Sequence, residues 1–408
     1  MNKQRRGGCG GGVFLLLLVM GILLLGVAYF SGAFEQAQDW LGPQVTTTQP
    51  PPTLPPVPRP VELARAGSFR HHYRNLTPAQ QVAYRDILEQ LPYFPESVPV
   101  QNLSKDDLRA VFSAITLDQP LLFHMSAANY RVRTVGDTVT AFVPEYRLDR
   151  EEYLRRIEAL AALVETIPLP QEGSDFDVQL ALHDFLLRHC EYSDDLEADD
   201  GEVGTVYGAL IRGSASCMGY SQAMLLLLEL NGIDAYIVTG YAENAAFSGK
   251  HAWNKVRIDG NWYYLDATWN DPVSENGREI ISRAFFNVTA ADLAQSHELS
   301  GGNVTSTAQN YFRVRGLYFN QLDRNAEARL AQGIVEALDN ERGVFEFRMA
   351  NAQALQQAHD YLFGQQGRIH SILAIADPGG NRLRRDRVYQ HVIEQFNVIR
   401  IFPVEQEG

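Results

Sequence analysis

The run Met224–Leu228, of sequence MLLLL, has no polar face at helical spacing. A helix that is apolar on every side must be buried, so this run predicts a central helix around which the rest of a domain packs. The pattern indicates a helix from Cys217 to about Leu230, and Asn231-Gly232 supplies the residues that end helices. Residues 233–239 then have the β-branched character of a strand.

Cys217 lies where a loop of small residues enters this helix. Ser214 or Ser216 can supply the N-cap oxygen. Free backbone N–H groups and the positive end of the helix dipole favour an anion there, so the position favours a thiolate. We therefore expect a reactive cysteine.

A hairpin follows, because Asp259-Gly260 is a strong signal for a two-residue type I′ turn. The register of such a turn pairs Ile258 with Asn261 and Trp253 with Asp266. It brings His251 and Asp266 to the same face as diagonal neighbours, within reach of each other. The hairpin alone thus predicts a hydrogen bond between these two side chains. That Cys217 faces this pair is a further hypothesis.

These residues resemble the catalytic core of the transglutaminase-like superfamily, whose fold is similar to that of papain. The matching motifs are Cys217-Met-Gly-Tyr, His251-Ala-Trp-Asn and Asp266-Ala-Thr-Trp. The close match covers about a sixth of the chain, and looser similarity extends from about residue 138 to 312. The resemblance implies an α+β fold, with Cys217 as nucleophile, His251 as general base and acid, and Asp266 as the group that orients the imidazole. We expect no cofactor and no metal.

The oxyanion of such a reaction needs hydrogen-bond donors. The backbone N–H of Cys217 is one. Tyr207 and Trp253 are candidates for a second donor or for substrate contact, although packing in the core is the favoured interpretation for Trp253.

The N-terminus has the features of a membrane anchor. Basic residues in positions 3–6 precede a charge-free stretch, in which 13–30 is almost wholly apolar. Eighteen helical residues span about 27 Å, nearly the thickness of a bilayer core. We predict a cytoplasmic segment 1–12, a transmembrane helix 13–34 and an extracytoplasmic remainder. A cleaved signal peptide is the alternative.

The rest of the chain divides by composition. Residues 35–61 form a proline-rich linker, 62–167 a mainly helical region, 168–310 the transglutaminase-like core, and 311–408 a small α/β domain. The net charge of −14 and the absence of a basic patch argue against a nucleic-acid partner.

Other cysteine and histidine residues suggest no second site. His183, His189 and Cys190 share one predicted helix, where core packing is favoured over metal binding because adjacent residues point apart. Cys190 and Cys217 are both expected to be free.

Three functions remain open. The favoured one is a membrane-anchored cysteine enzyme that hydrolyses or transfers amide bonds of a peptide or protein substrate of the cell envelope. The second is a non-catalytic module that uses the same fold to bind cell-wall or protein partners. The third is a Cys/His/Asp metal site, for which a single thiol is a sparse ligand set.

Overall fold

The computed structural model describes residue 55 and residues 57–193, 201–244, 247–272, 280–299, 303–340 and 344–406. The predicted anchor at 13–34 and most of the predicted linker at 35–61 lie outside these residues. Within the described ranges, no helix has both the length and the apolar character needed to cross a membrane. Residues 1–55 and 56–408 are separate units, and the description below concerns the second.

The first part of this unit combines helices with a sheet. Its helices are α2 (His71–Arg74), α3 (Pro78–Gln90), α4 (Lys105–Asp118) and α5 (Arg150–Thr166), and its strands β1 (Val98–Leu103), β2 (Met125–Val135) and β3 (Thr138–Tyr146) pair antiparallel in the order β1-β3-β2. Capping boxes at Thr77 and Ser104 open α3 and α4. The mainly helical description misses β1, an edge strand whose proline at position 99 weakens the strand pattern.

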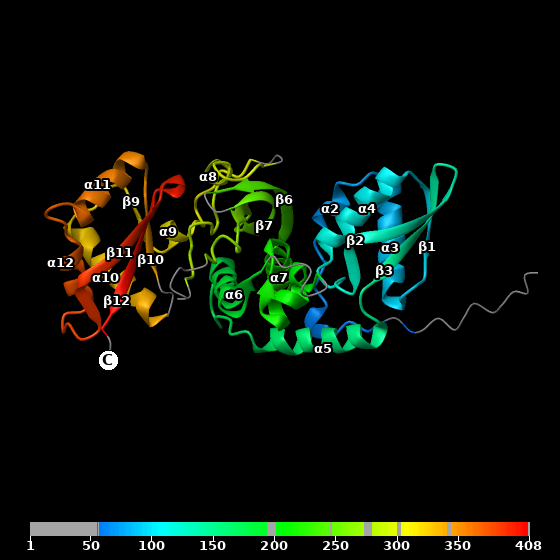
Figure 1. The fold of residues 1–408 in the computed structure, drawn as a ribbon, viewed down its shortest axis with the longest axis horizontal. Helices are drawn as coiled ribbons and strands as arrows, with labels where there is room; N and C mark the ends of the chain where they lie inside the picture. The colour runs from blue at the N-terminus through cyan, green and yellow to red at the C-terminus, as the bar shows by residue number, and fades with distance from the viewer. Residues whose placement is uncertain are drawn as a thin grey trace, which may run out of the picture. The chain divides into compact units, whose positions relative to one another are not determined.

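The central part is built on α7 (Cys217–Leu230), which packs against β7 of an antiparallel sheet (Figure 1). The sheet has the order β6-β7-β8, with β6 (Ala235–Glu243), β7 (Ser248–Ile258) and β8 (Asn261–Leu265). The run Met224–Leu228 is buried throughout, so the prediction of a central helix is confirmed. The other elements here are α6 (Asp175–His189), the short parallel pair β4 (Glu191–Tyr192) and β5 (Ser214–Ala215), the π-helix Gly208–Arg212, and α8 (Ala290–Leu293).

The β7–β8 hairpin has the predicted turn and register. Asp259 and Gly260 have φ angles of 47° and 78°, as a type I′ turn requires. Pairing runs from Ile258–Asn261 to Asn254–Leu265. Asp266 leaves the ladder one residue early, because its N–H donates instead to the carbonyl of Phe285 at 3.2 Å.

The start of α7 differs from the prediction in one respect. Ser216 occupies the N-cap position, but its hydroxyl donates to the carbonyl of Val203 at 3.3 Å and does not cap the helix. Ser214 lies in β5. At the other end, Asn231 is the C-cap and Gly232 has a φ of 77°, as expected.

The last part is a four-stranded sheet with helices. Its elements are α9 (Tyr311–Val314), β9 (Tyr318–Phe319), α10 (Arg324–Asp339), β10 (Phe345–Met349), α11 (Ala352–Phe363), α12 (Ile369–Ala376), β11 (Leu383–Ile393) and β12 (Val398–Glu405), and the strand order is β11-β12-β10-β9. The β11 strand is arginine-rich and lies at the edge of the sheet, which explains why its sequence gives no apolar strand signal. One apolar cluster runs continuously from this part into the central part.

Candidate active site

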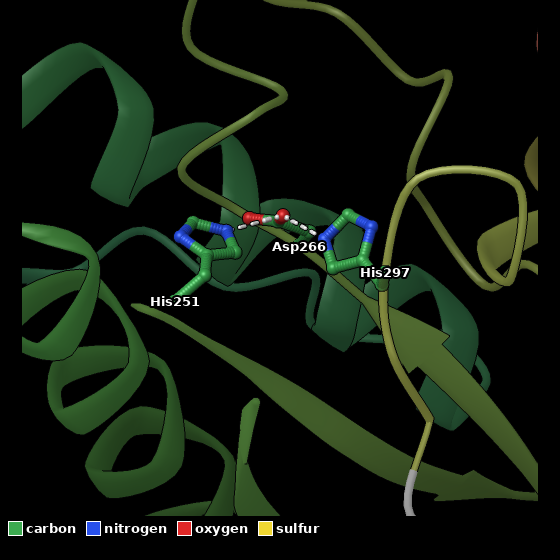
Figure 2. A group of neighbouring side chains, drawn as sticks. All are labelled: His251, Asp266 and His297. Atoms are coloured by element: carbon green, nitrogen blue, oxygen red, sulfur yellow. Dashed lines mark hydrogen bonds and ion pairs between the residues drawn. The ribbon is translucent and has the colours of Figure 1, made fainter. Parts of the chain in front are cut away.

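A buried histidine and a buried aspartate meet where β7 and the end of β8 lie together. The Nε2 atom of His251 lies 2.8 Å from Oδ2 of Asp266 (Figure 2). Both side chains are almost fully excluded from solvent. The hydrogen bond predicted from the hairpin register is therefore present.

Asp266 accepts hydrogen bonds at both carboxylate oxygens. The backbone N–H of Trp269 donates to Oδ1 at 3.1 Å. A second histidine, His297, brings its Nε2 atom to Oδ2 at 3.1 Å. Because several donors fix the carboxylate, its orientation toward His251 is set by the fold.

The charges at this site are strongly coupled. Burial alone would raise the pKa of Asp266, but the charge and hydrogen bond of His251, with the hydrogen bond of His297, hold that pKa well below its usual range. Burial would likewise lower the pKa of His251, yet Asp266, with a further contribution from Cys217, raises it well above its ordinary value. The arrangement therefore favours an imidazolium beside a carboxylate.

Cys217 opens α7 and is half-buried, so its thiol is more accessible than the histidine and the aspartate. Cys217 is among the groups that raise the pKa of His251, after Asp266. Since Nε2 of His251 faces Asp266, the other ring nitrogen, which points away from the carboxylate in Figure 2, is the one available to the sulfur. The structure thus brings His251 and Asp266 into contact, and the catalytic roles of Cys217, His251 and Asp266 stay predictions.

The two candidates for a second oxyanion donor lie in different surroundings. Tyr207 stacks on Phe123 with ring centroids 5.6 Å apart, and the guanidinium of Arg156 lies 4.5 Å from its ring centre. Trp253 is fully buried and stacks on His251 at 6.0 Å. Its indole N–H has no partner among the described residues. The roles of both residues in catalysis stay predictions, and the burial of Trp253 agrees with a packing function.

Several further residues surround the histidine. The rings of Phe247 and Trp269 lie 5.6 and 5.3 Å from that of His251. His297 contributes to Asp266 from a segment 31 residues further along the chain. Trp269 belongs to the Asp266-Ala-Thr-Trp motif, but no motif or periodicity marks Phe247 or His297, so only a three-dimensional fold can reveal those two.

The other histidine and cysteine residues of α6 are held by the core. His183 is fully buried, and burial lowers its pKa to about 4. The Nε2 atom of His189 lies 2.5 Å from the carbonyl oxygen of Leu210. Cys190 is a free, buried thiol, as Cys217 is a free, half-buried one. The structure therefore supports packing for this helix.

One group among the described residues has the composition of a metal site. The ligand atoms of His251, Asp266 and His297 all lie within 4.8 Å of one another. This group includes two members of the predicted triad but not Cys217. If the protein binds a metal ion at this site, these three residues are the candidate ligands.

The central part of the chain is similar to a known protein family. Residues 168–267, which include all three predicted triad positions, match the family model described as the transglutaminase-like superfamily. This part of the chain therefore carries a transglutaminase-like core, within a mixed helix-and-sheet protein.

The relatives are distant. The kyphoscoliosis peptidase of Mus musculus is 29% identical over 112 residues, which cover 25% of this chain and 17% of the mouse protein. The kyphoscoliosis peptidase of Homo sapiens is 27% identical over 130 residues, or 29% of this chain and 19% of the human protein. The chain thus matches less than a fifth of the length of these relatives. A solved structure, the periplasmic domain of TgpA from Pseudomonas aeruginosa, is 19% identical, with a TM-score of 0.18 over 33% of this chain and 57% of that domain.

Proposed function

We propose that this chain is a membrane-anchored, extracytoplasmic cysteine enzyme that acts on peptide or protein amide bonds through a thioester on Cys217. The observation that carries the proposal is the hydrogen bond between Nε2 of the buried His251 ring and Asp266. Cys217 is among the groups that raise the pKa of this histidine. A thiol, an imidazole and a carboxylate in this order form a nucleophile, its acid–base partner and an orienting group.

The chemistry follows from the position of the protons. The Cys217 thiolate attacks the carbonyl carbon of an amide, and the imidazolium of His251 gives its proton to the departing amine. Water or a second amine then attacks the thioester, returns a proton to His251 and releases the thiolate. Asp266 keeps the imidazole in the required orientation throughout.

Two further features support the proposed stabilisation of the oxyanion and the proposed reaction class. The backbone N–H of Cys217, at the first turn of α7, is the proposed oxyanion donor. The curated relatives are named as peptidases, which agrees with an amide substrate.

The proposed location rests on the N-terminal sequence. Basic residues in positions 3–6 precede the apolar stretch 13–30, which indicates an anchor with the N-terminus in the cytoplasm. The proline-rich segment 35–61 would then extend from the membrane. Peptides or proteins of the cell envelope are the proposed substrates, because they share this location.

The test uses the full-length chain, a library of N-acetylated peptides and a biotinylated primary amine. Mass spectrometry would show new amino termini if water resolves the thioester, and biotinylated peptides if the amine does. Cys217→Ser should abolish both products, whereas Cys190→Ser, the matched control thiol, should leave them unchanged. Products that persist in Cys217→Ser would refute the proposal. The absence of products with both cysteines intact would favour the non-catalytic binding module.

A further inference from the structure

We propose that His297 is a positioning residue that holds the Asp266 carboxylate in the orientation that His251 needs. This inference rests on the proposed function, since it assigns His297 to the same site. It differs from the expected three-residue arrangement because the carboxylate would then serve two imidazoles. His251 and His297 both approach one oxygen, Oδ2, at 2.8 and 3.1 Å (Figure 2).

The backbone of His297 is fixed by the edge of the central sheet. Ser296 accepts a hydrogen bond from the N–H of Glu243 at 2.8 Å, and Glu298 donates to the carbonyl of Tyr241 at 2.7 Å. His297 itself forms an isolated bridge with residue 242 of β6. A side chain at Gly240 would place its Cβ 2.8 Å from the carbonyl oxygen of Glu298, so the glycine allows this close approach. The pairing of this segment with β6 therefore positions His297 at the site.

Aromatic rings enclose the His297 side chain. It is buried, with ring centroids 4.8 Å from Trp253 and 4.5 Å from Trp269. Phe285 lies at 6.1 Å. The titratable groups that face the ring are Asp266 and His251, whose ring lies at 5.5 Å. A buried imidazole confined in this way keeps its partners, because water cannot replace them.

Both ring nitrogens of His297 have hydrogen-bond partners, and the chemistry of the carboxylate sets the direction of the bond to Asp266. The Asp266 carboxylate is ionised, so it can only accept, and Nε2 of His297 must donate. Nδ1 lies 2.9 Å from the hydroxyl oxygen of Ser296, which can donate to a neutral ring. The same hydroxyl oxygen accepts from the side-chain amide of Gln395 at 2.7 Å. The Ser296 hydroxyl can also donate to the carbonyl of Leu293, at 3.4 Å, so the direction of donation is fixed only at the carboxylate. Hydrogen bonds nevertheless connect Gln395 through Ser296 and His297 to Asp266.

This chain of hydrogen bonds starts outside the central part. Gln395 belongs to the turn between β11 and β12, and its amide also donates to the carbonyl of Asp292 at 3.1 Å. Beside it, Phe396 packs edge-on against Phe285 at 4.6 Å. The small C-terminal sheet thus supports the segment that carries His297. This gives the C-terminal part a role in the geometry of the site.

The experiment compares two amide substitutions that differ by one methylene group. In His297→Gln the amide nitrogen reaches about as far as Nε2 of the histidine, so it can donate to Asp266. In His297→Asn the amide is too short to reach the carboxylate. Proton NMR of the full-length chain would follow the far-downfield resonance of the proton between His251 and Asp266, which needs no substrate. The alkylation rate of Cys217 at pH 7 would be measured alongside it.

The proposal predicts that His297→Gln keeps the downfield resonance and that His297→Asn loses it. Alkylation of Cys217 should be about tenfold or more slower in His297→Asn, because small displacements of a catalytic group can cost up to about 10²-fold in rate. Retention of the resonance in both variants, or its loss in both, would overturn the proposal. Stoichiometric zinc in the wild-type protein that disappears in His297→Asn would overturn it in favour of a metal site.

The two proposals can fail separately. If the resonance follows this pattern but the chain forms no product from peptides, the role of His297 stands and the enzymatic function falls. If Cys217-dependent products form but the downfield resonance is the same in both His297 variants, only the positioning role of His297 is refuted.

Discussion

The side-chain amide of Asn254, in β7, donates a hydrogen bond to the backbone carbonyl of Ser221, in α7, at 3.0 Å. Asn254 is fully buried and lies three residues after His251, while Ser221 lies four residues after Cys217. The bond therefore joins the strand that carries the histidine to the helix that carries the cysteine. It is a direct physical link between the two elements whose meeting the sequence could only suggest.

Replacing Asn254 by alanine should weaken this junction. Loss of a buried hydrogen bond and of the side-chain volume is expected to lower the free energy of unfolding by about 1–3 kcal/mol. Alkylation of Cys217 should slow as well, because the thiol and the imidazole lose their fixed separation. Denaturant unfolding and a timed alkylation assay measure the two effects. The matched control is Asn261→Ala, at the exposed first residue of β8, which should change stability by less than about 0.5 kcal/mol. Equal effects of the two substitutions would contradict the role of the link.

Gly219 should not tolerate a side chain. A Cβ atom there would lie 2.3 Å from the carbonyl oxygen of Val203 and 2.8 Å from Cβ of Ala215. Gly219→Ala must therefore displace the first turn of α7, at a cost of about 1–3 kcal/mol. Gly204→Ala is a suitable control, because its Cβ would have no atom within 4 Å. Thermal unfolding of both variants checks this, and a melting temperature that falls only in the control would refute it.

Arg400 should be essential to the joint between the central and C-terminal parts. Its Nε atom lies 2.7 Å from the Glu346 carboxylate, which is buried and also accepts from Ser282 and from the N–H of Arg283. Arg400→Met leaves a buried charge without its counterion, so we expect a loss of about 3–5 kcal/mol in chemical denaturation.

The control for Arg400 is the exposed ion pair between Arg109 and Asp106. Arg109→Met should cost no more than about 1 kcal/mol. If Arg400→Met lowered the free energy of unfolding as little as this control, the remaining hydrogen bonds, and not the ion pair, would stabilise the buried Glu346 carboxylate.

Glu229 should make stability depend on pH near neutrality. Burial raises the pKa of this carboxyl to about 7, although the N–H groups of Gly67 and Phe69 oppose the shift by donating to it. Because the pKa of Glu229 is higher in the folded state than in the unfolded state, its contribution to stability is fully present below about pH 4.5, the unfolded-state pKa. That contribution is lost as the pH rises through about 7, the folded-state pKa. We therefore expect the stability advantage of the wild type over Glu229→Gln to be larger at pH 5 than at pH 8. Urea unfolding at both pH values measures the difference. An advantage that grows with pH would mean that the two backbone donors outweigh burial.

The sequence could predict those parts of the fold that depend on local patterns. The apolar run in α7, the Asp259-Gly260 turn and the capping residues Thr77 and Ser104 each act within a few residues. The hydrogen bond between His251 and Asp266 follows from the hairpin register, because Asp266 comes directly after β8, which pairs with the strand that carries His251.

Features that depend on long-range packing could not be predicted in the same way. His297 reaches Asp266 from a segment with little regular structure, and its own sequence resembles that of an ordinary loop. Ser216 has the residue type of an N-cap, but the approach of Val203 draws its hydroxyl away from the helix. In both cases a distant backbone segment, absent from any local pattern, determines what the side chain does.

The pH dependence of Cys217 alkylation tests the central claim most directly. Full-length protein would be treated with iodoacetamide from pH 4 to pH 10, and the modified cysteine identified by mass spectrometry, with Cys190 as the internal reference because burial raises the pKa of its thiol to about 12. The account predicts that Cys217 reacts rapidly well below the pH at which free thiols ionise, and that His251→Ala abolishes this reactivity at low pH. Alkylation of Cys217 that follows an ordinary thiol titration, and is the same in His251→Ala, would contradict it.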